Sequence, residues 1–549
     1  MKLKKLVVIL LCLVMILPIL FACNGTTDNT PSTTASPGAP TSAPEQPSSD
    51  IKPPATEVTR DTLTIAVDND DGSLSPAHLT GGLYTAMECI FEPLWDFTED
   101  GELIPVLMES YEVTAEDCWR IKLRQGVTFS NGNVFNADDV IFSLKFWKTV
   151  GVNAVRVQSI DDTRTVKIDD YTIDLYQPYF YVMHNTAASM FMIYDEESFD
   201  ENKFALNPIG TGPYVVKDYV TNSHLFLERR DDYWGTAPDV QFLNFRVMAE
   251  PAQVVNGLST NDLDVGRIQL SDYAYIDSLD GFNIHSQARG GGVQLWFNSG
   301  HKGAFTFIDK DPQKVREMRY AIFHAIDPQA IIDLLYEGRG RLMYCQAPDF
   351  CQDFEPAFNK LTSTYAEGYN VELAQQYADS SGLTGATVTM MTNGLPTMVN
   401  LAEILQNMLD KIGVTVVINN TDPATFNTEQ YSKEAEYDIR VGEGIAPNWR
   451  VADALVNGVR YSEALTVPGA FPDNDYNLEL APKTISTFDD AQRREYLLET
   501  LTKFQEEAIG YSLCMYDTSY TVTSDVDFNS IRFNLCSGYI RYKDIKWAS

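Results

Sequence analysis

The stretch WRIKLRQGVTFSNG at residues 119–132, followed by NADDVIFSL at residues 136–144, decides the fold class of this 549-residue chain. Its first part alternates apolar and basic residues with a period of two, as in a strand with one buried face. Gly126 and Asn131-Gly132 then break the chain, and Asn136 can cap a helix that runs through Trp147. The stretch therefore predicts a strand, a turn and an amphipathic helix in succession.

A second unit of this kind lies at residues 388–418. The apolar residues 388–391 and 414–418 predict two strands, and the segment 399–409 between them predicts a helix with one apolar face. Such a β-α-β unit places its strands parallel, with a right-handed crossover. Residues 62–67, TLTIAV, alternate with period two and predict the first strand of the chain.

Further motifs follow in order along the chain. They read PIGTGPY at 208–214, WFN at 296–298, AID at 325–327 and YNVELA at 369–374. The glycines of PIGTGPY predict turn conformations that are closed to other residues. Together with residues 119–144, these motifs resemble the family 5 extracellular solute-binding proteins, the peptide- and nickel-type receptors of ABC importers. The resemblance extends from about Thr62 to the C-terminus.

This resemblance implies a two-lobed, periplasmic-binding-protein-like α/β fold of the class II type, with an extra subdomain and a hinged ligand cleft. The implied parts are lobe 1 at 61–295 plus 515–549, its extra subdomain at about 93–206, and lobe 2 at 296–514. The chain would cross between the lobes near 296–298 and near 513–516. Two crossovers form a hinge that closes over a ligand.

The N-terminus carries an export signal. Lys2, Lys4 and Lys5 precede a short apolar core that ends at Ala22 and Cys23. The apolar run of fifteen residues is shorter than the roughly 20 that span a membrane. The pattern resembles a lipoprotein signal, which implies removal of residues 1–22, acylation of Cys23 and anchoring outside the cytoplasm; an ordinary secretory signal is the alternative. Residues 23–60 are rich in Pro, Ser and Thr and predict a disordered linker.

Composition limits the partners. The chain has 41 Lys and Arg against 76 Asp and Glu, a formal net charge of −35. Such a surface repels phosphate backbones, so we expect no nucleic-acid partner. Hydrophobic residues make up 44% of the chain, as in a globular protein. The expected partners are a small solute and the permease and ATPase subunits of an importer, and we expect the chain itself to be a monomer.

The most plausible cargo is an oligopeptide or dipeptide, with an oligosaccharide or a metal complex as the alternative. Candidate ligand contacts lie near the implied lobe junction and in the loop after residue 442, where peptide-binding relatives place an acid for the ligand's amine. Each candidate also fits as a core residue. They are Tyr84, Trp296, Asn298, Arg440, Glu443, Trp449 and Tyr516.

The sequence motifs give little support for an enzymatic activity. Ser299-Gly300-His301-Lys302 has the S-x-x-K spacing of serine acylases, but its S-D-N and K-T-G partner motifs are missing. We therefore expect no catalysis, with an extracellular hydrolase as the rival class. The DNDDG stretch at 68–72 hints at calcium but is more typical of a turn, so no metal or cofactor is expected. Cys345 and Cys351 are close enough in sequence to form a local disulfide.

Overall fold

The computed structural model describes residues 60–79, 82–98, 102–149, 152–157, 160–177, 190–298, 300, 302–343, 351, 353–430, 432, 434–443, 451, 480–487, 489–508, 510–534 and 538–549. Residues 60–549 form a compact unit by themselves. Within the described residues, no helix combines the length and the apolar character needed to cross a bilayer. The predicted signal peptide, the acylation site Cys23 and almost all of the linker lie outside the described residues.

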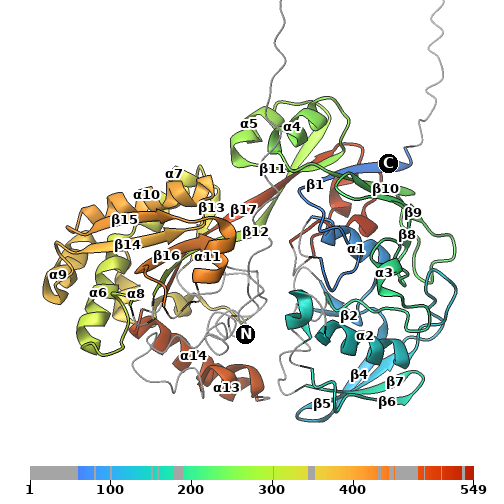
Figure 1. Cartoon of the computed structure of the whole chain (residues 1–549), viewed down its shortest axis with the longest axis horizontal. Coiled ribbons are helices and arrows are strands. Elements are labelled where there is room, and N and C mark those ends of the chain that lie inside the picture. The colour runs from blue at the N-terminus through green and yellow to red at the C-terminus, as the bar shows by residue number, and fades with distance from the viewer. Residues whose placement is uncertain are drawn as a thin grey trace, which may run out of the picture. The chain divides into compact units, whose positions relative to one another are not determined.

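One large mixed sheet runs through the unit (Figure 1). Neighbouring strands follow the order β15-β14-β16-β12-β17-β11-β1-β10-β9-β8, and β13 pairs with β17 off this path. The strands, in that order, are Thr415–Asn420, Thr387–Thr392, Ile439–Glu443, Phe282–Phe297, Gly510–Thr523, Val265–Ile268, Thr62–Val67, Phe242–Val247, His224–Arg229 and Tyr214–Val220, with β13 at Gly340–Leu342.

A first hydrophobic cluster covers one end of this sheet. It joins β1, β8, β9 and β10 to the helices α1 (Tyr84–Ile90) and α2 (Ala137–Thr149) and to the C-terminal segment with Tyr542. Two small antiparallel sheets belong to the same cluster: β2 (Trp95–Phe97) with β3 (Leu103–Pro105), and the sheet β4-β5-β7-β6. The strands of the latter are Met108–Ala115, Cys118–Leu123, Thr172–Tyr176 and Val166–Asp169. These small sheets lie within the region expected as an extra subdomain.

A second hydrophobic cluster forms around β14, β15 and β16. Helix α10 (Pro396–Asp410) packs on these strands, and α6 (Pro312–Ala325) packs on α9 (Val371–Ser381). The helices α7 (Pro328–Leu335), α8 (Ser363–Glu367), α11 (Pro423–Glu429), α13 (Ala481–Ser486) and α14 (Asp490–Glu506) lie in the same part of the sequence. Shorter helices α3, α4 and α5 span Glu201–Phe204, Pro251–Ser259 and Tyr273–Ile276.

Strand β17 belongs to both clusters, and β12 pairs with it antiparallel along most of its length (Figure 1). Tyr520 and Val522 contribute to the first cluster, whereas Val293, Leu295 and Tyr511 contribute to the second. The register between the two strands shifts between Gln287 and Gly291, just before the residues of β12 that lie in the second cluster. Val293 and Leu295 already lie in the second cluster, slightly before the expected lobe boundary at 295/296.

The local structure of residues 119–147 confirms the prediction from periodicity. Trp119, Ile121 and Leu123 of β5 are buried on one face. The side chain of Asn136 accepts a hydrogen bond from the amide of Asp138 (2.7 Å), and Asp139 accepts one from the amide of Asn136 (2.8 Å). This reciprocal cap fixes the start of α2. The predicted β-α-β unit is also present, with β14 and β15 parallel and α10 between them.

The glycines of residues 208–214 act differently from the prediction. Neither Gly210 nor Gly212 is among the residues with positive φ. A Cβ atom on Gly210 would lie 2.1 Å from the carbonyl oxygen of Ile90, and one on Gly212 would lie 2.6 Å from that of Cys89. The glycines therefore allow the chain before β8 to approach the backbone of α1, where the amide of Gly212 donates to Ile90 (2.9 Å).

Candidate functional site

Alternate residues of β12 point to opposite faces of the sheet, and this alternation builds the candidate site. Val293, Leu295 and Phe297 are buried in the second cluster. Gln294 and Trp296 therefore face the other side. In the register of the sheet Gln294 pairs with Ser512 of β17, and Trp296 pairs with Arg440 of β16. We call Gln294, Trp296, Arg440 and Ser512 the polar face.

The residues of the polar face contact one another. The indole nitrogen of Trp296 donates to the side-chain oxygen of Gln294 (2.9 Å), and the amide nitrogen of Gln294 donates to the hydroxyl of Ser512 (3.4 Å). The guanidinium carbon of Arg440 lies 5.4 Å from the centre of the Trp296 ring system. This contact is a cation–π interaction, which holds the ring and the charge side by side.

Gly510 makes room for the Trp296 ring. It pairs with Trp296 in the register between β12 and β17. A Cβ atom on Gly510 would lie 2.8 Å from the indole ring of Trp296, so a larger residue would displace that ring. The half-buried Trp296 thus offers an apolar surface beside a permanent positive charge. Such a pair can bind a carboxylate through the guanidinium and an apolar group through the ring.

Asn298 is buried and does not belong to the polar face. Its side chain is 2% exposed, and its amide nitrogen donates to the carbonyl oxygens of Ala435 (3.0 Å) and Tyr437 (2.5 Å). Its side-chain oxygen accepts from the amide of Gly300 (2.8 Å). These bonds attach the end of β12 to the segment that leads into β16, so Asn298 supports the polar face from behind.

The remaining candidates are spread over several environments. Tyr84 is 2% exposed in the first cluster, where its hydroxyl donates to the carbonyl oxygen of Met190 (3.3 Å) and the guanidinium carbon of Arg156 lies 5.2 Å from its ring. Tyr516 packs against the second cluster and stacks on Tyr336, with ring centres 4.9 Å apart.

Two candidates cannot be placed fully. The backbone of Glu443 ends β16, opposite Val293. Its side chain and all of Trp449 lie outside the described residues. The structure therefore brings Trp296 and Arg440 together, and their roles as ligand contacts, like those of the other five candidates, stay predictions.

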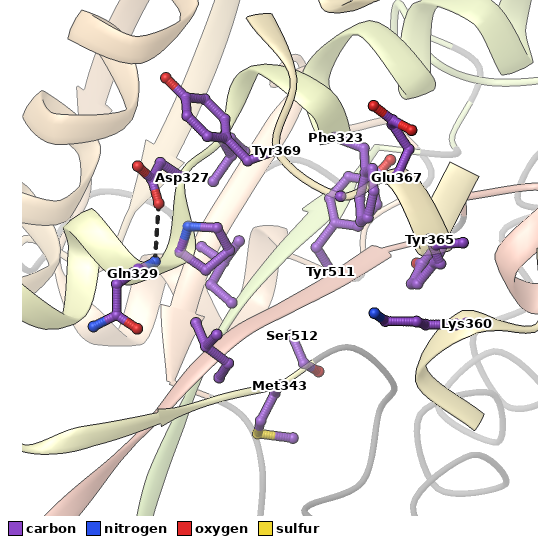
Figure 2. A pocket seen from close by; sticks show the side chains of 16 residues that line it. Phe323, Asp327, Gln329, Met343, Lys360, Tyr365, Glu367, Tyr369, Tyr511 and Ser512 are labelled. Carbon is purple, nitrogen blue, oxygen red and sulfur yellow. Dashed lines mark hydrogen bonds between the residues drawn. The ribbon is translucent and has the colours of Figure 1, made fainter. Parts of the chain in front are cut away.

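A pocket of about 260 Å³ lies near the polar face, and sequence reasoning missed it (Figure 2). Its walls come from the end of α6 and the start of α7, from the segment 360–369, and from residues 511–513 of β17. Ser512 belongs both to this pocket and to the polar face. The aromatic residues in TYAEGY at 364–369 were the available signal, but nothing in the sequence brings them to β17.

Other predictions concern metals and enzymes. Among the described residues, no group of three or more His, Cys, Asp or Glu side chains could hold a metal ion. The carboxylate of Asp70 accepts hydrogen bonds from the hydroxyl of Tyr219 (2.8 Å) and the amides of Gly72 and Asn222 (both 2.7 Å), as expected for a structural turn. Lys302 of the S-x-x-K stretch forms an exposed ion pair with Glu436 (2.9 Å), which raises the lysine pKa.

Two of the predicted features lie partly outside the described residues. Ser299 and His301 of the S-x-x-K stretch are not described. Neither is Cys345, so its pairing with Cys351 stays a prediction.

Known proteins resemble this chain over most of its length. The nickel-binding periplasmic protein of Escherichia coli is 22% identical over 525 residues, which cover 88% of this chain and 94% of that protein. The dipeptide-binding protein of Escherichia coli is 23% identical over 430 residues, which cover 70% of this chain and 75% of that protein.

A solved structure shows the same fold. The ABC transporter substrate-binding protein CtaP from Listeria monocytogenes superposes with a TM-score of 0.74 at 20% identity, covering 89% of this chain and all of that one. The fold therefore matches the class II periplasmic binding proteins, as the resemblance implied.

The family assignment rests on a direct match. The model of the bacterial extracellular solute-binding proteins, family 5, matches residues 102–464, about two thirds of the chain. Members of this family are transport receptors without enzymatic activity, which confirms the expectation that this chain is not an enzyme. The match includes the polar-face residues Gln294, Trp296 and Arg440. This chain belongs to the family 5 bacterial extracellular solute-binding proteins.

Proposed function

We propose that this chain captures a peptide on the polar face, encloses it by movement of the two clusters about β12 and β17, and delivers it to the permease of an ABC importer. The observation that carries the receptor role is the family match over residues 102–464. Strand β17, which contributes to both clusters, and its partner β12, with a register shift at residues 287–291, support the enclosing movement. Closure over the solute requires only that the ligand prefers the closed state.

The polar face fits the chemistry of a peptide. The guanidinium of Arg440 can accept a terminal or side-chain carboxylate in a bidentate contact, and the Trp296 ring can cover an apolar side chain. Glu443, at the end of the neighbouring strand β16, is our candidate partner for the α-amine. The similarity to a dipeptide-binding protein supports this choice of cargo.

A metal complex is the second candidate. Similarity to a nickel-binding protein over 88% of this chain favours it. Because no described cluster of His, Cys, Asp and Glu side chains could hold a bare ion, the metal would arrive as a complex. Arg440 would then bind a carboxylate of the chelator. An oligosaccharide stacked on Trp296 would be a third kind of cargo.

A ligand screen on the unit 60–549 tests the proposal. Isothermal calorimetry and thermal unfolding with di- to octapeptides, metal–histidine complexes and oligosaccharides should show binding of peptides. A ligand at 100 times its dissociation constant stabilises the folded state by about 2.7 kcal/mol. Binding of the metal complexes or sugars, with no response to any peptide, would refute the peptide assignment.

Two variants connect the cargo to the polar face. Trp296→Ala and Arg440→Gln should each weaken peptide binding about tenfold or more, since each removes a contact to the ligand. Arg494→Gln, an exposed arginine that pairs with Glu355 on the surface, serves as the matched control and should leave the affinity unchanged. Unchanged affinity in both polar-face variants would place the cargo elsewhere.

We also propose that acylated Cys23 anchors the receptor to the outer side of the membrane through the linker 23–60. A linker of this length has a root-mean-square reach of about 35 Å, enough to leave the receptor free to meet the permease. Metabolic labelling with a radioactive fatty acid should mark the chain, and Cys23→Ser should abolish the label. A labelled Cys23→Ser variant would overturn this anchor.

A further inference from the structure

The pocket beside β17 has the size of a site for one small molecule. Its volume is about 260 Å³. For comparison, an apolar cavity of about 150 Å³ holds benzene, and drug-sized ligands occupy about 300 Å³ or more. A molecule with one or two rings therefore matches the available space.

Three aromatic rings from three different elements form one side of this pocket (Figure 2). Phe323 of α6 stacks on Tyr365 of α8 with ring centres 4.5 Å apart, and it lies 4.8 Å from Tyr511 of β17. The hydroxyl of Tyr365 donates to the carbonyl oxygen of Gly510 (3.4 Å), which fixes α8 against the strand. Tyr365 and Tyr511 are 2% and 3% exposed, so the half-buried Phe323 offers most of the accessible aromatic surface of this group.

A lysine side chain stands beside these rings. Lys360 lines the pocket, and Figure 2 shows its ammonium group directed toward the middle of the lining residues. No described carboxylate forms an ion pair with Lys360. Its segment is held in place because buried Gln505 donates to the carbonyl oxygen of Phe358 (2.6 Å) and accepts from the amide of Thr362 (3.2 Å).

The two acids of the lining already have partners. Asp327 caps α7 by accepting from the amides of Gln329 (3.1 Å) and Ala330 (3.2 Å). Glu367 accepts from the side chain of Asn370 (2.6 Å). These hydrogen bonds come from uncharged donors. Lys360 is the one cationic side chain among the described residues of the lining and is therefore the group that can pair with an anion.

We propose that this pocket, which shares only Ser512 with the polar face, is a second binding site for a small aromatic carboxylate. The ring of the ligand would pack against Phe323, which Tyr365 and Tyr511 hold in place, and its carboxylate would pair with Lys360. The site lies entirely within the second cluster's part of the chain, so it does not depend on the import role proposed above.

Calorimetry with 3-phenylpropionate as the probe tests this site on the unit 60–549. The acid should bind, whereas the uncharged 3-phenylpropionamide should bind about tenfold more weakly, because it lacks the charge that pairs with Lys360. The cation 2-phenylethylamine should not bind. Equal affinity for acid and amide, or preferential binding of the amine, would overturn the proposal.

Single substitutions test whether 3-phenylpropionate binds in this pocket. Lys360→Gln should weaken binding about tenfold, and Ala366→Trp, at an exposed position of the lining, should fill the pocket and abolish binding. Lys411→Gln, an exposed lysine on the end of α10, is the matched control and should change nothing. Trp296→Ala should leave the affinity for 3-phenylpropionate unchanged; a tenfold loss in this variant would instead make the pocket part of the solute site. Thermal unfolding checks that each variant is folded.

Discussion

Replacing Asn298 tests whether this residue supports the polar face or binds the ligand. In Asn298→Ala, the carbonyl oxygens of Ala435 and Tyr437 and the amide of Gly300 each lose a hydrogen bond in a nearly water-free environment. A net hydrogen bond is worth about 1 kcal/mol, and a buried group left without a partner costs about 1–3 kcal/mol. The free energy of unfolding of the part containing the second cluster should therefore fall by about 3 kcal/mol.

Urea unfolding followed by tryptophan fluorescence measures this loss. Asn407→Ala is the matched control, because Asn407 is an exposed asparagine that bonds only to the carbonyl oxygen of Glu403 in its own helix (2.8 Å). The control should change the stability by less than about 0.5 kcal/mol. If Asn298→Ala lost less than 1 kcal/mol but bound peptide at least tenfold more weakly, the residue would be a ligand contact and our structural assignment would fail.

Three further predictions concern stability. Burial raises the pKa of Glu88 to about 7, so the folded state binds the proton more tightly than the unfolded state. The contribution of Glu88 to the free energy of unfolding should therefore fall by up to about 3 kcal/mol as the pH rises from about 4.5 to 7. Glu88→Gln should remove this contribution and flatten the pH dependence by that amount in unfolding experiments at several pH values. Gly210→Ala should lower the free energy of unfolding by about 3 kcal/mol, since the Cβ atom of the alanine would lie 2.1 Å from the carbonyl oxygen of Ile90. A melting temperature equal to that of the parent protein would contradict this close approach. Arg319→Met should lower the free energy of unfolding by about 3 kcal/mol. The reason is that the fully buried guanidinium donates to the carbonyl oxygens of Phe305 (2.7 and 3.1 Å) and Glu507 (2.8 Å). A loss below about 1 kcal/mol in urea unfolding would refute this role.

Local features could be predicted from the sequence because they depend on neighbouring residues. The alternation at 119–123 and the cap at Asn136 act within one or two turns of chain, and both occur as predicted. The glycines at 210 and 212 show the limit of such reasoning. Their presence was clear, but the reason for it is the backbone of α1, about 120 residues earlier in the chain.

The site could be predicted only in part for the same reason. Trp296 and Arg440 were both identified, yet their contact arises from the pairing of β12 with β16, which the sequence does not specify. From sequence alone, a short polar side chain such as Asn298 at the end of a strand can be interpreted equally well as a ligand contact or as a structural support. The pocket was missed because its three walls meet only through tertiary packing.

The most direct test of the account is a distance measurement between its two parts. Spin labels on cysteines introduced at the exposed positions Lys145 of α2 and Asn407 of α10 would report the separation of the two clusters by pulsed electron paramagnetic resonance. Addition of a peptide that binds in calorimetry should replace a broad or long distance distribution by a shorter, narrower one. An identical distribution with and without bound peptide would show that the molecule does not close on its solute.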